Sequence, residues 1–161
     1  MQDTYSSNRI ILQKLTVADA LPFYTLYTYR KERTDFTENP FRKDERPAAF
    51  TERIIALCEC IFTVRIKEKP EQIIGDCALH DWDPATGEIE IGGSLFPEFW
   101  GLGLMHAAFE LLIGIAKNEF LAKAIIGKTN VDNRNAIRLV QKMGFQKDRV
   151  SGNGIIMRKQ L

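Results

Sequence analysis

The sequence predicts a mixed α/β fold, built as one domain over residues 1–161 with about seven strands and about four helices. Three observations predict this class. Strand-like apolar runs cluster in the middle of the chain, a long apolar helical stretch follows them, and strand and helix patterns then alternate. Hydrophobic residues make up 45% of the chain, which suits one globular core. Too many strands follow one another for a dinucleotide-binding fold, which would alternate strand and helix from its start.

The elements follow from apolar spacing and from turn residues between the apolar runs. Strands are expected over residues 8–15, 61–66, 73–82, 87–96, 122–128, 145–150 and 155–159, and helices over 16–29, 47–58, 106–121 and 133–143. Turns are expected at Glu68–Glu71, Asp83–Gly87 and Ser151–Gly154. The polar stretch 30–46 has no steady period and is interpreted as a loop with at most one helical turn.

Three helix ends carry recognisable end signals. Thr16 is followed by an acid at Asp19, which is the spacing of a capping box. Pro47 suits the first turn of a helix, where its missing N–H costs nothing. Gly144 stands where a helix commonly ends, because glycine adopts the left-handed conformation freely.

Composition excludes several functional classes. A formal net charge of +1 gives no electrostatic reason to expect nucleic acid as a partner. No apolar run approaches the roughly 20 residues of a membrane span, and the polar N-terminus lacks a signal-peptide layout. Cys58, Cys60 and Cys77 are odd in number and form no paired motif, which favours reduced thiols in the cytoplasm. His80 and His106 lie far apart, so no metal site is expected.

The stretch from Trp100 to Met105 is the most informative segment. Gly101 and Gly103 directly precede the long apolar helix, where free backbone N–H groups and the helix dipole favour an anion such as a pyrophosphate. A plain strand-to-helix connection that uses glycine for its turn is the alternative, and the turn alone does not decide between them.

Three segments, in this order, resemble the GNAT acetyltransferases, specifically the ribosomal-protein N-terminal acetyltransferase (RimJ/RimL) type. They are Glu88–Gly92, Phe99–Met105, and Asn130–Asn133 continued by Lys142–Phe145. The resemblance implies a strongly twisted mixed sheet flanked by helices and acetyl-CoA as the cosubstrate. It also implies direct acetyl transfer to a primary amine, either a protein N-terminus or a small molecule such as a polyamine, an amino acid or an aminoglycoside.

The resemblance also implies which residues hold acetyl-CoA. The pyrophosphate would lie on the turn amides, and the pantetheine arm would run beside the splayed strand end Gly92–Phe96. The expected cofactor-binding residues are Leu95, Phe96, Trp100, Gly101, Leu102, Gly103, Leu104, Met105, Asn133, Arg138 and Lys142. An N-cap role for Asn133 and solvated surface for Arg138 and Lys142 are the alternatives.

This chain departs from the family pattern at three places. Leu102 stands between the two glycines, where relatives have a basic residue, so binding must depend more on backbone amides. Gly93 and Ser94 replace a Tyr-Trp pair, which should open the acceptor side of the cleft or leave room for a loop. Ala136 and Val140 stand where relatives place a serine or a tyrosine, and neither can protonate the leaving thiolate.

Acetyl transfer to an amine requires removal of a proton, because amines are mostly protonated at neutral pH. Glu90 is the expected catalytic base, with Glu88 on the same strand face as the reserve; ordinary solvent-facing acids are the alternative. A backbone N–H near Leu95 would hold the thioester oxygen. Acceptor-side candidates are His80, Asp81, Asp83, Trp82 and the stretch Tyr29–Arg46.

Two other functions stay open. The missing proton donor is compatible with a weak or inactive CoA-binding or sensing module of the same fold. A nucleotide-binding domain is the third hypothesis. The sequence leaves the oligomeric state open, with a homodimer among the alternatives.

Overall fold

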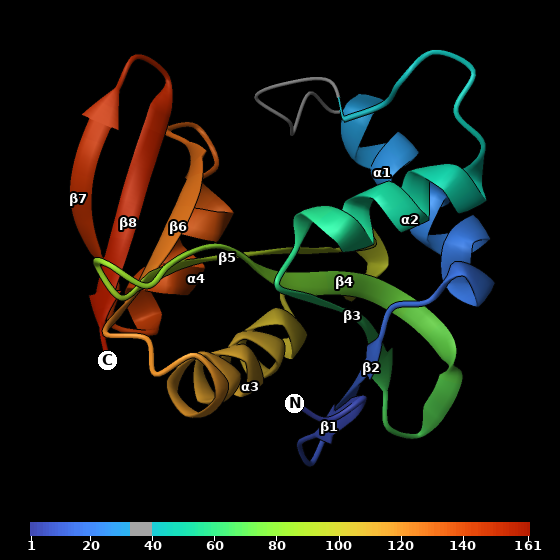
Figure 1. Ribbon diagram of the computed structural model, residues 1–161, viewed down its shortest axis with the longest axis horizontal. Coiled ribbons are helices and arrows are strands. Elements are labelled where there is room, and N and C mark those ends of the chain that lie inside the picture. The colour runs from blue at the N-terminus through green and yellow to red at the C-terminus, as the bar shows by residue number, and fades with distance from the viewer. Residues whose placement is uncertain (33–39) are drawn as a thin grey trace.

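A computed structural model describes residues 1–32 and 40–161, with side chains described through residue 29 and from residue 40 onward. Across this part of the chain, eight strands form one sheet in the order β1-β2-β3-β4-β5-β6-β8-β7 (Figure 1). Neighbouring strands are antiparallel except β5 and β6, which are parallel. The predicted mixed α/β class is therefore confirmed. No helix in the described residues is long and apolar enough to cross a membrane.

The elements have the following bounds. The strands are β1 (Thr4–Ser6), β2 (Ile10–Lys14), β3 (Cys60–Ile66), β4 (Lys69–Asp83), β5 (Glu88–Leu95), β6 (Ala124–Asn130), β7 (Gln146–Ser151) and β8 (Gly154–Gln160). The α-helices are α1 (Ala20–Glu32), α2 (Pro47–Leu57), α3 (Leu104–Glu119) and α4 (Arg134–Lys142), and short 3-10 helices are η1 (Val17–Asp19) and η2 (Pro97–Phe99).

The strand count exceeds the prediction by one. The additional strand, β1, has only three residues and pairs with β2 at the edge of the sheet, so its sequence carries too little alternation to be recognised. The turn expected at Glu68–Glu71 lies earlier, because Ile66 already pairs with Lys69. Pro70 is therefore inside β4, next to a register shift in the β3–β4 pairing, which is where a strand tolerates proline.

The three predicted helix-end signals are confirmed. The Asp19 carboxylate accepts hydrogen bonds from the Thr16 backbone N–H at 3.1 Å and from its hydroxyl at 3.0 Å. Pro47 is the first residue of α2. Gly144 follows α4 with φ +87°, and its N–H donates to Gln141. The long helix begins two residues before the prediction, immediately after Gly103.

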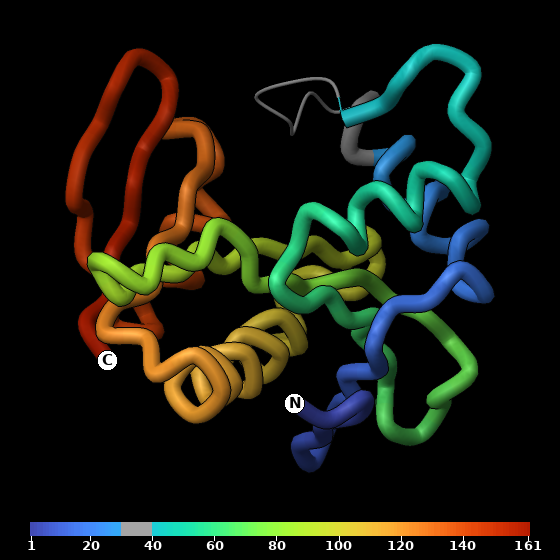
Figure 2. The backbone as a smooth tube through the Cα atoms, in the orientation of Figure 1, coloured from blue at the N-terminus to red at the C-terminus, as the bar shows by residue number. Residues whose placement is uncertain are grey.

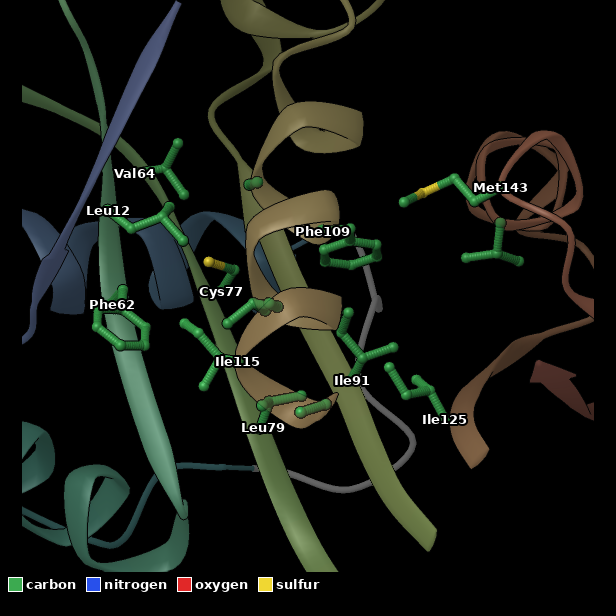
Figure 3. Close-up of a cluster of buried hydrophobic side chains, with 14 of the residues drawn as sticks. Leu12, Phe62, Val64, Cys77, Leu79, Ile91, Phe109, Ile115, Ile125 and Met143 are labelled. Atoms are coloured by element: carbon green, nitrogen blue, oxygen red, sulfur yellow. The ribbon is translucent and has the colours of Figure 1, made fainter. Parts of the chain in front are cut away.

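Two apolar clusters lie on opposite faces of the sheet. On one face, Phe23 of α1 and Phe50 of α2 pack with Ile61 and Ala78 of the strands. On the other face, α3 packs against the central strands, and Figure 3 shows Phe109 and Ile115 of α3 among strand residues. Successive strand residues point to opposite faces, so this alternation decides which side of the sheet each polar residue of β4 and β5 occupies.

In Figure 2, β4 and β5 cross the middle of the molecule and link the part that holds α1 and α2 to the part that holds β6, β8 and β7. β4 spans 15 residues and carries a register shift against β5 between His80 and Asp83. Asp81, at this shift, has φ +52°, a left-handed conformation that aspartate tolerates better than most residues. The shift lies opposite the part of β5 that carries Glu90.

Candidate active site

β5 and β6 separate in the middle of the sheet. Their parallel pairing covers Glu88–Glu90 of β5 and Ala124–Ile126 of β6, and it stops there although both strands continue. In Figure 1, β6 turns away from β5 beyond this point. The last residues of β5, Ile91–Leu95, therefore pair with β4 along one edge while β6 leaves the other edge.

The open edge of β5 presents backbone N–H groups. Hydrogen bonds alternate along an antiparallel pair, so neighbouring residues direct their N–H groups to opposite edges. The Phe96 N–H donates to the Ile74 carbonyl at 2.9 Å, on the β4 side. Phe96 is one of the expected cofactor-binding residues, but its backbone N–H is thus already bonded within the sheet. The alternation directs the N–H groups of Leu95 and Gly93 to the edge that β6 leaves.

The glycine turn ends directly at the start of α3. Gly101 and Gly103 have φ values of +73° and +74°, which glycine adopts without the steric cost of a side chain. Gly103 is the N-cap of α3, and no side chain caps this helix start in the described structure. The first N–H groups of an α-helix have no partner inside the helix, so those of Leu104 and Met105 are available at the turn. The Leu104 side chain is buried and contributes to the core instead.

Two side chains hold the turn in place. The Trp100 indole N–H donates to the Leu95 carbonyl at 2.8 Å, which ties the turn to the end of β5. Arg9, just before β2, donates from Nη1 to the Leu102 carbonyl at 2.7 Å. The Leu102 side chain itself is half exposed. Sequence reasoning missed Arg9, because 93 residues separate it from Leu102 and no local pattern connects them.

Glu90 lies where β5 and β6 begin to separate, and it belongs to a polar cluster. Its Oε2 is 2.5 Å from the Lys128 Nζ of β6, and its Oε1 is 3.8 Å from His80 Nε2 of β4. The Glu90 side chain is 13% exposed and the His80 side chain 28%, so both are partly shielded from water. Pairing with Glu90 raises the pKa of Lys128 above its usual value. Lys128 was not among the predicted site residues.

His80 joins a further acid to this cluster. Its Nδ1 lies 3.3 Å from Asp81 Oδ2, so the ring stands between two carboxylates. His80, Asp81 and Glu90 each offer one ligand atom within 4.8 Å of the others, a grouping that the separation of the two histidines in sequence did not suggest. The Lys128 ammonium offsets the charge of Glu90, the more buried of the two carboxylates.

The other predicted acids have structural partners. Glu88 pairs with Arg158 of β8 and lies opposite Ala124, in the closed part of the β5–β6 pair. Asp83 shapes the β4–β5 turn: one carboxylate oxygen accepts from the Ala85 N–H and the other from the Thr86 hydroxyl, both at 2.9 Å. These bonds lower the pKa of Asp83 below its ordinary value.

Trp82, expected beside the acceptor, lies on the face of the sheet opposite His80. Its ring packs on Phe120 at 5.9 Å, within the cluster on the α3 face of the sheet. The reason is the shift at Asp81, which reverses the alternation, so that Trp82 and His80 lie on opposite faces. Part of the predicted acceptor stretch Tyr29–Arg46, namely residues 33–39, lies outside the described residues.

The two glycines of β5 have different surroundings. A Cβ on Gly93 would lie 2.7 Å from the Asp76 carbonyl oxygen, so the close approach of β4 excludes any side chain there. A Cβ on Gly92 would meet only His80 Nε2, at 3.4 Å. Gly92 thus leaves space beside His80 and Glu90, while Gly93 is required by the sheet itself. Ser94 donates its hydroxyl to the buried Asp76 at 2.8 Å.

The start of α4 follows the predicted alternative for Asn133. Its side-chain oxygen caps the helix by accepting from the Ala136 N–H at 3.3 Å, and its amide nitrogen donates to Thr129 at 3.0 Å. Arg138 and Lys142 are exposed on this helix. Val140 is buried in the core, which leaves no proton donor at this position.

The chain is similar to known acetyltransferases. A family model described as an acetyltransferase (GNAT) domain matches residues 9–146. Uncharacterized N-acetyltransferase p20 of Bacillus licheniformis is 31% identical over 87 residues, which are 54% of this chain and about half (48%) of that relative.

Solved structures support the same fold. Microcin C7 self-immunity acetyltransferase MccE, solved with acetyl-CoA and AMP, has a TM-score of 0.78 at 21% identity, over 96% of this chain and 94% of its own. The ribosomal-protein-S5-alanine acetyltransferase of Vibrio fischeri has a TM-score of 0.75 at 16% identity, over 99% and 97%.

Proposed function

Because this chain belongs to the GNAT acetyltransferase family, we propose that it transfers the acetyl group of acetyl-CoA directly to a primary amine, with both substrates bound together. The observation that carries this proposal is the separation of β5 and β6 directly after Glu90. It puts a partly buried carboxylate, an open strand edge and an uncapped helix start in one continuous stretch of chain.

Each part of acetyl-CoA has a proposed partner in this site. The amides of Gly101–Met105, with the α3 dipole, would hold the pyrophosphate. A Cβ on Gly101 would meet no atom within 4 Å, so a ligand can approach the turn backbone closely. The pantetheine amides would pair with the open edge of β5, as an added strand does. The N–H near Leu95 would polarise the thioester oxygen. Asn133, Arg138 and Lys142 complete the proposed site from α4.

Glu90 is the proposed base for the amine. Lys128 holds one of its oxygens, and the other lies 3.8 Å from His80 Nε2, so a proton accepted by Glu90 would reach His80 through a bridging water. Glu88 stays the reserve base, less suitably placed because it pairs with Arg158. The thiolate would take its proton from bound water or solvent, since Ala136 and Val140 carry none.

The acceptor is proposed to bind on the face of the sheet that α1 and α2 cover. Glu90 and His80 share this face with Ala78, by alternation along the strands. We also propose the RimJ/RimL-like type with a protein N-terminus as the acceptor, a proposal compatible with the shared fold of the ribosomal-protein-S5-alanine acetyltransferase. Small amines are the other acceptor class. We further propose that residues 1–161 act as one domain, in the cytoplasm.

A catalytically weak or inactive CoA-binding module is the second candidate. The observation that favours it is the burial of Val140 in the core, which leaves α4 without an acid at that place. Such a module would bind acetyl-CoA and release thiol only at the rate of uncatalysed hydrolysis.

One set of measurements separates these functions. Binding of acetyl-CoA is measured by calorimetry, and thiol release is followed with N-terminal peptides, polyamines, amino acids and aminoglycosides. We expect at least one amine to accelerate release, and Glu90→Gln to lower kcat by about 100-fold, the scale of a lost general base, without weakening acetyl-CoA binding. Glu71→Gln, an exposed acid on β4, is the control.

Each outcome bears on one hypothesis. Binding without acceleration by any amine would leave the sensing module, whereas a thermal shift with ATP alone, and none with acetyl-CoA or NAD, would reject both in favour of a nucleotide-binding domain. Equal activity of the Glu90→Gln and wild-type proteins would remove Glu90 as the base and redirect the test to His80 and Glu88.

A further inference from the structure

The turn that is proposed to hold the pyrophosphate contains no cation of its own. Residues 97–105 include one acid, Glu98, and no lysine or arginine. A pyrophosphate with its two negative charges would therefore meet backbone N–H groups alone, if nothing reached the turn from elsewhere in the fold. Exposed N–H groups at a helix start favour an anion by about 0.3–1 kcal/mol, which is modest for such a ligand.

Arg9 reaches this turn from the other end of the sequence. Its Nη1 donates to the Leu102 carbonyl at 2.7 Å, and the same nitrogen would lie 3.4 Å from a Cβ on Gly103. The guanidinium thus lies against both residues that separate Gly101 from α3. One of its five N–H donors makes the hydrogen bond to Leu102, and the planar guanidinium of arginine is well suited to phosphate oxygens.

The backbone of Arg9 is fixed independently of the turn. Its N–H donates to Ser7 Oγ at 3.2 Å, and its carbonyl accepts from the Lys67 N–H at 3.0 Å. Both partners belong to the hairpin ends beside β2 and β3. The side chain therefore extends from a fixed point, which lowers the entropy lost when it engages a ligand.

We propose that Arg9 is a positioning residue for acetyl-CoA, and this rests on the function proposed above. It holds the Leu102 carbonyl, which orients the turn so that the N–H groups of Gly103 and Leu104 face the ligand. Its guanidinium, on the carbonyl side of the Leu102–Gly103 peptide, also adds a positive charge beside the turn, which attracts the pyrophosphate through space and which Leu102 cannot supply. The charge at this site comes from the β1–β2 hairpin, not from the turn.

The test compares two variants. Arg9→Gln keeps an N–H donor but loses the charge, whereas Arg9→Lys keeps the charge but loses the planar guanidinium with its several donors. Lys67→Gln is the matched control, because Lys67 is an exposed cation of the same region whose Nζ donates to the Ser7 carbonyl at 3.1 Å and not to the turn. Calorimetry gives the Kd for acetyl-CoA at low and high salt, and thermal unfolding checks that each variant folds.

We expect Arg9→Gln to raise the Kd for acetyl-CoA about 5- to 30-fold at low salt, the range of a lost charge-assisted contact. The difference should shrink at high salt, because exposed charges are screened. Arg9→Lys should recover part of the affinity at low salt, and Lys67→Gln should match the wild type. S-acetylpantetheine, which has no pyrophosphate, should be turned over equally by the wild type and Arg9→Gln.

Two results would overturn the role of Arg9 while leaving the proposed function intact. One is an unchanged Kd in Arg9→Gln. The other is an equal loss with acetyl-CoA and S-acetylpantetheine at both salt concentrations, which would indicate a general structural effect. Failure of the wild type itself to bind acetyl-CoA would instead reject the proposed function, and the role of Arg9 with it.

Discussion

Alanine at Gly101 tests whether the left-handed shape of the turn matters for function. Gly101 has φ +73°, and a Cβ there would meet no atom within 4 Å. The substitution therefore adds no clash, and its whole effect comes from the backbone conformation. This separates it from Gly93, where a Cβ would lie 2.7 Å from a backbone oxygen of β4.

The size of the effect follows from the conformation. A residue with a Cβ loses about 1–2 kcal/mol in the left-handed region. Restricting the unfolded chain returns about 0.4–1 kcal/mol, so at the middle of both ranges the net loss in the free energy of unfolding is about 0.8 kcal/mol. If the free protein instead relaxes the turn, stability is kept and binding must restore the shape. The Kd for acetyl-CoA then rises by up to about 30-fold.

The assay measures both quantities on the same samples. Urea unfolding gives the free energy of unfolding, and calorimetry gives the Kd for acetyl-CoA. Gly114→Ala is the matched control, because Gly114 lies inside α3 and a Cβ there also meets no atom within 4 Å. Alanine should stabilise that helix position by about 0.8–1 kcal/mol and leave the Kd unchanged. The melting temperatures of the two variants should differ by about 3–10 °C.

The penalty must appear either in stability or in affinity. A Gly101→Ala protein that matches the wild type in both would mean that the turn is not held at positive φ. The role given to its N–H groups in binding the pyrophosphate would then be refuted. Reduced stability with an unchanged Kd would confirm the conformation and reject only its contribution to binding.

Three other predictions concern the core, the thiols and the ion pair. Phe50→Ala should lower the free energy of unfolding by about 3–5 kcal/mol, because the ring of Phe50 is fully buried between α1, α2 and the sheet. Urea titrations measure this loss, and a loss under about 1 kcal/mol would contradict the packing. Burial raises the pKa of Cys58 to about 12 and that of Cys60 to about 11. The thiols of the folded protein should therefore resist a thiol reagent at pH 8 and react fully in denaturant. Rapid labelling of the native protein would disprove this protection. Pairing with Glu90 raises the pKa of Lys128, so the stabilisation from this pair is present below the ordinary lysine pKa of about 10.4 and is lost as the pH rises through the folded pKa. As the pH is raised above about 10.4, urea titrations should show the wild type losing more stability than Lys128→Met, and parallel curves would count against the pair.

Local signals in the sequence were sufficient for much of the fold. The Thr16–Asp19 capping box, Pro47 and Gly144 each act within a few residues, and each has the predicted role in the structure. β1 could not be predicted, because three residues at a sheet edge carry no alternation and form a strand only by pairing with β2. The turn before β4 lies earlier than Pro70 suggests, because this proline is inside β4 beside a register shift and not in the turn.

The candidate site was predictable where its residues belong to one segment. The glycine turn and the acid on β5 were recognised because each stands in a continuous pattern of the chain. Arg9 and Lys128 were not, since each reaches its partner only when distant strands assemble. No spacing rule connects Arg9, just before β2, with the Leu102 carbonyl before α3.

One backbone angle decides which side chains of β4 share a face with Glu90. Ala78 and His80 lie on the face covered by α1 and α2, and strict alternation would add Trp82 to that face. Asp81, at φ +52°, absorbs an extra residue and sends the Trp82 ring to Phe120 on the other face. The bulge also puts the Asp81 carboxylate beside His80. Where such a bulge falls cannot be read from alternation, because the left-handed residue breaks the very pattern used to assign faces. The Asp81 conformation thus adds a second carboxylate to the cluster that contains Glu90 and Lys128, and it puts the Trp82 ring on the face away from that cluster.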